Sequence, residues 1–549
     1  MKTKLKESED KDTKEDNYEN FDTDEDESQK PKKKKITKNI LPIIFISILI
    51  FTLIYLFFYV YKDNESIILN GNKPTLELSK ETKCLSYDEN KKECQACNPG
   101  DKLINGKCNL NHSFKAVYQI DSTSENVKLF DIPKGVISEM TIDGEKVEPT
   151  ASYKFETSGE HTVYVLIDMN KCLTLSGIFN GSKKLISIEF TPLFHTERIN
   201  EMSGMFQNCV KLTSVDVSHF DTKNVEYMDY LFSGCSSLKS LNLLNFNVEN
   251  VEKMNSVFQG CCSLESIDLS TWKTNKMKNI EYLFARCSSL TSINISNFNT
   301  EKVEVMQRVF MGCSSLTSID LSNFNTKSAR TMFGFFSGCS SLKSINLSNF
   351  DTKKVRNIEN MFKGCSNLTT IDLSNFETKN MLRISGLFYG CTSLTSFNLK
   401  SFNTENLIDF DYLFYNCKSL TSIDVSNFNT EDITSMNSMF SGCSSLTSID
   451  LTNFNTLNVE NMDEMFADCT SLTSLDLSYF KTYNIERMKG IFSGCSNLKY
   501  LDITGFYGNV ETSGMLNGVS MSGKVRVQKS FKETIKKHAP KKWLIEIEE

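Results

Sequence analysis

Cysteine has the most reactive side chain in this sequence, and twelve of the eighteen cysteines lie 26 residues apart without a slip in register. A fixed period of about 20–50 residues is typical of one supersecondary unit stacked on copies of itself. Stacking would bring neighbouring sulfurs near disulfide distance. Each thiol, however, has Leu and Phe beside it, and a free buried Cys behaves as a small hydrophobe. We therefore expect core thiols, with disulfides as the alternative and with Cys262 as an exposed exception. The series is Cys209, Cys235, Cys261, Cys287, Cys313, Cys339, Cys365, Cys391, Cys417, Cys443, Cys469 and Cys495.

A second series places Asp or Asn seven residues after each of these cysteines. This position lies between two apolar ones on a strand and should point out of the core. The simpler interpretation is a solvated Ser/Thr/Asp face. The alternative is a concave acidic strip that binds cations or basic ligands, and its weak metal candidates are the last four carboxylates. These are Asp424, Asp450, Asp476 and Asp502.

The elements that must position both series can be read from the unit that begins at Cys313. Leu316, Ile319, Leu321 and Phe324 give the pattern L-x-x-I-x-L-x-x-F, a variant of the leucine-rich repeat signature. The alternation predicts a short strand with one buried face.

The second half of the same unit changes period. Ala329, Met332, Phe335 and Phe336 follow the spacing of one face of a short helix. Thr326 lies just ahead of that stretch, where its hydroxyl can cap free N–H groups. Gly precedes the cysteine in eight of the twelve units, where a left-handed C-cap is needed. Each unit is thus predicted to be strand, turn, short helix and turn, which makes the fold class an α/β solenoid of about twelve units.

The repeat C-S-S-L-T-S-I-D-L-S-N-F-N-T-x-x-V-x-x-M-x-x-M-F-S-G resembles the BspA-like leucine-rich repeat of bacterial and protist surface proteins. The resemblance covers about residues 183–508. It implies a cell-surface protein associated with adhesion or with binding of host or matrix components. It implies no catalytic residue and no cofactor.

Residues 40–61 form a run of 22 residues without a charge, which is long enough to cross a bilayer as a helix. The lysines at 32–35 precede this run, so the positive-inside rule predicts a cytoplasmic N-terminus and an extracellular remainder. Residues 1–38 are rich in both charges and poor in apolar residues, which predicts a disordered tail. We expect the membrane helix at 39–62 and a polar stalk at 63–83.

Four cysteines within residues 84–108 follow the stalk, and outside the cell they favour two disulfides over a zinc site. Alternating apolar residues at 109–182 predict a small sandwich-like β-domain ahead of the solenoid at 183–508. Residues 509–549 read as strand, helix and strand, a plausible C-terminal cap. The candidate disulfide residues are Cys84, Cys94, Cys97 and Cys108.

Motifs of catalysis are nearly lacking. The five histidines are scattered, and no H-E-x-x-H, G-x-S-x-G or phosphate-binding glycine loop occurs. The net charge of −7, without a basic patch outside the tail, argues against nucleic acid as a partner. Sequons give six glycosylation candidates: Asn64, Asn111, Asn180, Asn294, Asn346 and Asn367.

Taken together, these patterns predict a single-pass plasma-membrane protein that is not an enzyme. Its leucine-rich repeat ectodomain would bind an extracellular protein or a matrix or cell-surface ligand. A structural surface coat without a specific ligand is the alternative, as is a surface receptor. If the strand face does not bind, the binding surface is expected on the convex helices of the solenoid, beginning with Arg330, Arg356 and Tyr412.

Overall fold

The structure, a computed structural model, describes residues 112–192, 194–508 and 510–548 and the backbone of four short strands between Cys84 and Asn109. The expected tail at 1–38, membrane helix at 39–62 and stalk at 63–83 lie outside the described residues. Within the described part of the chain, no helix has both the length and the apolar character needed to span a bilayer.

The cysteine-rich segment forms two hairpins. The first pairs Cys84 with Cys97 as Cα partners, and the second pairs Leu103 with Cys108. The cysteine side chains of this segment lie outside the described residues, so the disulfide prediction stays a prediction. The strands are β1 (Cys84–Asp88), β2 (Glu93–Cys97), β3 (Lys102–Ile104) and β4 (Lys107–Asn109).

Residues 113–167, within the range of the predicted β-domain, form strands β5 to β10. Its main sheet has the order β12-β11-β5-β10-β7-β8, and β6 pairs with β9 in a separate ribbon. Strands β5 and β10 largely alternate buried residues with half-buried or exposed ones, as the sequence pattern requires. The elements are β5 (Ser113–Ile120), β6 (Val127–Lys128), η1 (Lys134–Val136), β7 (Ile137–Ile142), β8 (Glu145–Lys146), β9 (Ser152–Tyr153) and β10 (Gly159–Ile167).

The β-domain and the solenoid share one sheet. Strand β11 (Leu185–Phe190) pairs antiparallel with β5 on one side and parallel with β12 (Ser214–Asp216) on the other. The sheet therefore runs across the boundary expected at residue 182. The β-domain covers the open edge of the first repeat strand, which a solenoid end requires.

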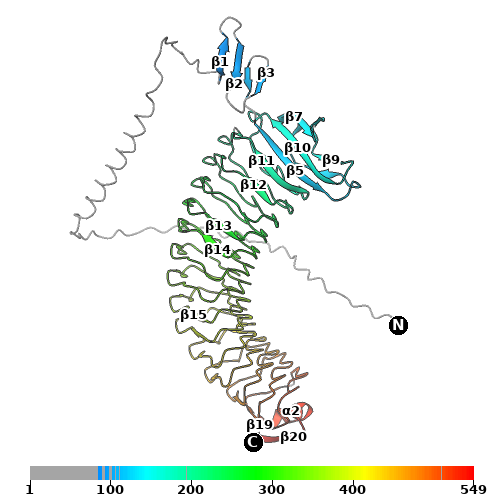
Figure 1. Cartoon of the computed structure of the whole chain (residues 1–549). Coiled ribbons are helices and arrows are strands. Elements are labelled where there is room, and N and C mark those ends of the chain that lie inside the picture. The colour runs from blue at the N-terminus through cyan, green and yellow to red at the C-terminus, as the bar shows by residue number, and fades with distance from the viewer. Residues whose placement is uncertain are drawn as a thin grey trace, which may run out of the picture. The chain divides into compact units, whose positions relative to one another are not determined.

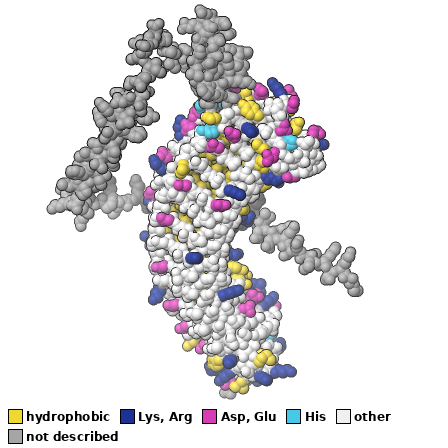
Figure 2. Space-filling view, in the orientation of Figure 1, with side chains coloured by type: hydrophobic (Ala, Val, Ile, Leu, Met, Phe, Trp, Pro, Cys, Tyr) yellow, Lys and Arg dark blue, Asp and Glu magenta, His cyan; other side chains and the backbone are white. Residues whose placement is uncertain are grey.

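The repeats stack side by side as one continuous series (Figure 1). Charged side chains of both signs lie on the surface of this stack (Figure 2). We call each 26-residue unit a coil, and we call the segment from 14 to 25 residues after its ladder cysteine the turn segment. Single parallel bridges join successive turn segments, from Glu201 to Arg383 and again from Asp409 to Glu511. The short repeat strands pair in parallel with neighbouring strands. Beyond β12 they are β13 (Ser266–Asp268), β14 (Ser292–Asn294), β15 (Thr370–Asp372), β16 (Ser396–Asn398), β17 (Ser474–Asp476) and β18 (Tyr500–Ile503).

The prediction of a short helix in each repeat is wrong, because no helix occurs between residues 194 and 508 in the described part of the chain. In the turn segment that begins at Lys327, alternate N–H groups donate to the next coil. Gly334 N donates to Glu359 O at 2.8 Å, and Phe336 N donates to Met361 O at 2.9 Å. The residues between them close i→i−3 turns.

Two left-handed residues in each coil make this arrangement possible. They lie five and one residues before the ladder cysteine, for example Gly334 at φ 60° and Gly338 at φ 76°. A right-handed helix cannot pass through such residues. The apolar spacing correctly predicted which side chains are buried, since Ala329, Met332 and Phe336 are fully covered. It did not reveal that the backbone bonds between coils rather than within them.

A column of phenylalanines, each three residues before a ladder cysteine, forms the centre of the core. The rings of Phe310, Phe336 and Phe362 stack nearly parallel, with centroids 5.7 and 5.9 Å apart. The same stacking continues from Phe206 to Phe492. Every ring therefore contacts both neighbouring coils, and no coil has a core of its own.

The C-terminal cap agrees with the prediction. Strands β19 (Ser522–Gln528) and β20 (Lys542–Glu548) extend the parallel ladder of β17 and β18, with η2 (Lys529–Phe531) and α2 (Lys532–His538) between them. Asp502 of β18 is buried and accepts a hydrogen bond from Arg526 Nη1 of β19 at 2.5 Å. This ion pair joins the cap to the last coil.

Candidate binding surfaces

The ladder cysteines are core thiols that bond between coils. All twelve are free and buried. Cys339 Sγ donates to Phe310 O at 3.1 Å, and Cys365 Sγ donates to Phe336 O at 3.2 Å, and the same bond recurs in every unit. Burial raises the pKa of Cys365 to about 12, so this thiol is not a nucleophile at neutral pH. The core-thiol prediction is confirmed, and Cys262 is exposed as expected.

The threonine ahead of most turn segments also bonds between coils. Thr404 Oγ1 donates to Asn429 O at 2.8 Å and accepts from Asn429 N at 2.7 Å. Thr326 Oγ1 donates to Asp351 O at 2.9 Å. Both threonines are buried. The prediction of a helix cap is therefore wrong, since the hydroxyl satisfies the backbone of the following coil.

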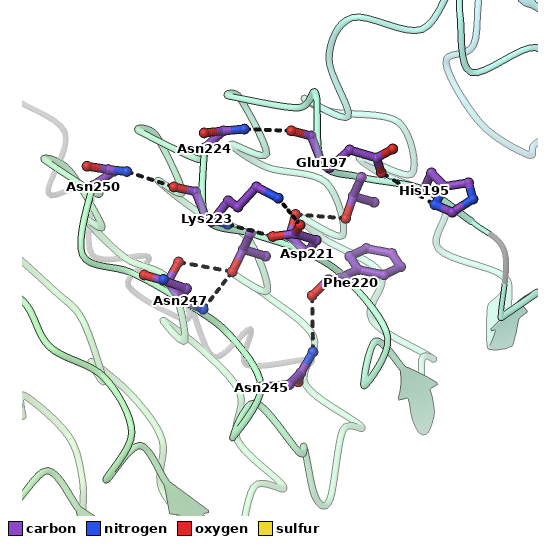
Figure 3. A network of polar contacts seen from close by, with 11 residues as sticks. His195, Glu197, Phe220, Asp221, Lys223, Asn224, Asn245, Asn247 and Asn250 are labelled. Carbon is purple, nitrogen blue, oxygen red and sulfur yellow. Dashed lines mark hydrogen bonds and ion pairs between the residues drawn. The ribbon is translucent and has the colours of Figure 1, made fainter. Parts of the chain in front are cut away.

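Asparagine side chains add a third set of bonds between coils. Figure 3 shows them in the first coils, where Asn224 Nδ2 donates to Glu197 O at 2.6 Å and Asn250 Nδ2 donates to Lys223 O at 2.7 Å. In the same view, Asn245 Nδ2 donates to Phe220 O at 3.1 Å. The polar groups that recur from repeat to repeat thus bond between coils, and these groups are not free to bind a ligand.

The Asp/Asn series closes turns at the ends of the repeat strands. Asp424 Oδ1 accepts from Ser426 N at 3.1 Å, and Asp450 Oδ1 accepts from Thr452 N at 3.0 Å. Hydrogen bonds from the hydroxyl and N–H of the second residue on lower the pKa of both carboxyls. Asn346 Oδ1 accepts the equivalent bond, so either Asp or Asn can occupy this position in the series.

The four carboxylates of the candidate metal strip lie in different environments. Asp424, Asp450 and Asp476 are exposed, whereas Asp502 is buried and paired with Arg526. Within the residues that the structure describes, no three His, Cys, Asp or Glu side chains could together hold a metal ion. The geometry favours the turn-closing role for these carboxylates.

The sequons fall on different surfaces. Asn294, Asn346 and Asn367 are exposed, and Asn180 is half-buried. Asn64 and Asn111 lie outside the described residues. Asn294 and Asn346 each use Oδ1 to accept from the backbone two residues on, at 3.3 and 3.0 Å. A glycan at either position would cover the strand face.

Two of the scattered histidines meet where the β-domain adjoins the first coil. The rings of His112 and His195 lie edge to face with centroids 5.1 Å apart. With Cys172, Glu197 and Arg198 they line a hollow of about 220 Å³. No sequence spacing could reveal this contact, because the two histidines are 83 residues apart.

The turn segments carry the residues that depart from the repeat. Tyr389 and Tyr415 stack with centroids 4.5 Å apart, Tyr412 lies 5.8 Å from Tyr415, and Lys363 Nζ lies 4.7 Å above the Tyr389 ring. Tyr412 is 38% exposed. Of the candidates named from the sequence, Tyr412 belongs to this cluster.

The two arginine candidates have different surroundings. Both are exposed. Arg330 Nε pairs with Glu304 Oε2 at 3.1 Å, and Arg356 has no ion pair among the described residues. Only Arg356 is therefore available as it stands to a negatively charged partner.

The period, the bonds between coils and the stacked phenylalanines define a tandem-repeat solenoid protein. The chain belongs to the family described as "Mycoplasma protein of unknown function, DUF285", whose model matches more than half of the sequence. The match confirms a repeat family, and the BspA-like resemblance stays a prediction. The matched stretches are residues 173–293, 265–369, 288–400, 330–447, 383–506 and 409–538.

Among solved structures, the chain is similar to the "Crystal structure of TLR13-ssRNA13 complex". The identity is 17% over 62% of this chain and 58% of that chain, with a TM-score of 0.20. The chain thus spans less than two thirds of that protein, and so distant a likeness carries no argument about function. No curated protein matches the chain.

Proposed function

We propose that this chain is a single-pass cell-surface protein whose solenoid binds other proteins, with adhesion to a cell or matrix surface as its role. The observation that carries the proposal is that recurring and variable residues have different roles within each coil. The repeated thiol, hydroxyl and amide groups bond between coils, and the variable residues lie on the turn segments. A solenoid presents such residues as one extended surface.

Membrane attachment is a part of the same proposal. The uncharged run at 40–61 and the lysines before it support a cytoplasmic N-terminus and an extracellular solenoid. A surface coat remains the second candidate, because glycans at the exposed sequons Asn294 and Asn346 would cover part of the strand face.

The test is a binding assay on intact cells that display the full chain. Such cells should bind saturably to one or more immobilised matrix proteins or to other cells, and cells without the chain should not. The binding itself separates the two candidates, because an adhesin should bind both before and after removal of the glycans, and a coat should bind in neither state. Cells that bind no matrix protein and no other cell would contradict the proposal.

A further inference from the structure

The turn segments change sign of charge at the middle of the stack. The segments at 327–338, 353–364 and 379–390 hold eight cations and one carboxylate. The next three, at 405–416, 431–442 and 457–468, hold nine carboxylates and no cation. We call these the basic half and the acidic half. The boundary between them falls between Gly390 and Glu405.

Most of this charge is not neutralised within the chain. In the acidic half only Asp463 has an ion pair among the described residues, with Arg487 at 3.4 Å. In the basic half, Lys354, Arg356, Lys363 and Lys379 have none with a described carboxylate. Unpaired charges of one sign on a surface create a field that reaches about 8–10 Å at physiological salt. Each half therefore favours a partner of the opposite charge.

An apolar patch lies at the boundary between the two halves. Leu382 and Ile408 occupy equivalent positions in neighbouring coils and are 46% and 54% exposed. Eight other coils have Glu, Lys or Arg at this position. The cluster of Tyr389, Tyr412 and Tyr415 lies on the same two turn segments, and we call these five residues the central patch. Large apolar side chains exposed together and rimmed by charge are typical of protein interaction sites.

The backbone is also irregular at this boundary. A parallel bridge joins each pair of successive turn segments from Glu201 to Glu511, with one exception. No bridge joins Arg383 to Asp409. The Ser385 hydroxyl donates to the Asp409 carboxylate there instead. The sequence thus departs from its own repeat in charge, in apolar exposure and in backbone bonding at one place.

We propose that the partner of this surface is a second copy of the chain, bound antiparallel about a two-fold axis at the central patch. In a two-fold interface, residue i contacts residue j while j contacts i. An axis between the coils of Leu382 and Ile408 sets the basic half of each copy opposite the acidic half of the other. A parallel pair would place like charges together, which is unfavourable.

The antiparallel arrangement gives the proposed adhesion a partner. The dimer is argued from the surface alone, and only its role in adhesion rests on the proposed function. The N-terminal ends of the two solenoids point in opposite directions, as they must for copies anchored in two facing membranes. The chain would then act as a homophilic adhesin.

The first test measures the mass of the purified full chain in detergent by sedimentation at low and high salt. We expect a dimer at low salt that weakens as salt rises. A basic-half variant (K354E, R356E and K363E) and an acidic-half variant (E431K, D432K and E460K) should each be monomeric. An equimolar mixture of the two should recover the dimer, because the unchanged acidic half of the first variant then lies opposite the unchanged basic half of the second.

A matched charge reversal tests whether position matters. The variant K223E, K276E and K278E changes three turn-segment lysines in the first coils, away from the central patch. It should dimerise like the natural chain. Loss of the dimer in this control, or a monomeric natural chain at low salt, would overturn the proposal.

Orientation is tested by cysteine cross-linking in a Cys262→Ser background, which removes the exposed native thiol of the solenoid. Arg356 and Thr434 are equivalent across the proposed axis, since they lie one coil beyond Leu382 and Ile408. A mixture of R356C and T434C chains should cross-link with a short bismaleimide, and neither chain alone should. Cross-linking of R356C to itself would show a parallel pair and would contradict the antiparallel arrangement.

The result can be separated from that of the proposed function. Cells that display the natural chain should aggregate, and mixing cells of the two charge variants should restore aggregation that each lacks alone. If the chain is monomeric but the cells still bind a matrix protein, the adhesion proposal holds and the homophilic inference fails. If the chain dimerises but no cells adhere, the inference holds and the adhesion proposal fails.

Discussion

At the scale of the residue, the buried threonine hydroxyl shows how a repeat uses its polar groups to satisfy the backbone of the next coil. Thr404 is 2% exposed and satisfies both the N–H and the C=O of Asn429 in the next coil. In one coil the equivalent residue is Val248, which has no hydroxyl to offer. The same position therefore provides its own comparison within a single chain.

Thr404→Val should destabilise the protein by about 1–3 kcal/mol, because two backbone groups of Asn429 lose a buried partner. Thr404→Ser keeps the hydroxyl and should cost clearly less. In the opposite direction, Val248→Thr should raise the melting temperature by supplying the missing bond. Chemical denaturation of the three variants measures these differences, and an unchanged midpoint for Thr404→Val would contradict the assigned role.

The left-handed residue before each ladder cysteine is glycine in most coils and Arg286 in one. Arg286 has φ 62°, a conformation that costs a side-chain-bearing residue about 1–2 kcal/mol. Arg286→Gly should therefore stabilise the chain by up to that amount. Gly338→Ala should destabilise it, because φ is 76° and the new Cβ would lie 3.4 Å from Gly312 Cα. Gly135→Ala, with nothing within 4 Å, is the control for both melting curves.

Carboxylates of two kinds should respond oppositely to pH. Burial raises the pKa of Asp411, although Ser435 Oγ and Asn437 N donate to it at 2.5 and 2.9 Å. A raised folded-state pKa means that stability is present below the unfolded value of about 3.9 and is lost as pH rises through the folded value. Asp411→Asn should therefore be more stable than the natural chain at pH 7, with an advantage that disappears on acidification.

Asp450 is the matched control for this pH response. Hydrogen bonds from Thr452 lower its pKa, so its contribution is present at neutral pH and is lost as pH falls through the folded value. Asp450→Asn should give no gain in melting temperature at pH 7. Equal responses of the two variants across the pH series would contradict the assignment.

At the scale of the element, the turn segment and the phenylalanine column depend on each other. The alternation of bonds between coils and bonds within a coil holds each ring directly over the next. Phe336 contacts Phe310 and Phe362 on its two sides and is fully buried. No local element can form without its neighbours, which makes the fold cooperative over short distances.

Phe336→Ala should cost about 3–5 kcal/mol, because it leaves a cavity shared by two neighbouring coils. In a solenoid, stability is nearly a sum of local contributions, so the unfolding transition should broaden or split. Tyr479→Ala removes an aromatic ring that is 56% exposed and should leave the transition unchanged. Calorimetry distinguishes the two variants. If the unfolding transition of Phe336→Ala had the same midpoint and width as that of the natural chain, the phenylalanine column would not join the coils.

At the scale of the whole molecule, topology is the prediction on which the proposed function depends most directly. The lysines before residue 40 and the uncharged run after them predict an N-terminus in the cytoplasm. Protease added to intact cells should remove a C-terminal tag and spare an N-terminal one. The reverse pattern would reject the surface location, and a protected C-terminal tag in permeabilised cells would show only that the fold resists the protease.

The sequence by itself determined the period, the number of coils and the residues that are buried. These features follow from the covalent spacing of apolar side chains, and Leu316, Phe336 and Cys339 are buried where that spacing predicted. The burial of the thiols and the strand–helix–strand character of the cap were predicted in the same way. Local chemistry was sufficient because each of these features repeats or lies within a few residues.

Only the tertiary structure decided how the coils are bonded to one another. The spacing of Ala329, Met332 and Phe336 fits a helix as well as the observed series of turns with two left-handed residues, since both bury the same face. The choice depends on hydrogen bonds between residues 25 apart, such as Phe336 N to Met361 O. For the same reason, the partner of Thr404, the contact of His112 with His195 and the burial of Asp502 beside Arg526 could not be predicted from local sequence patterns.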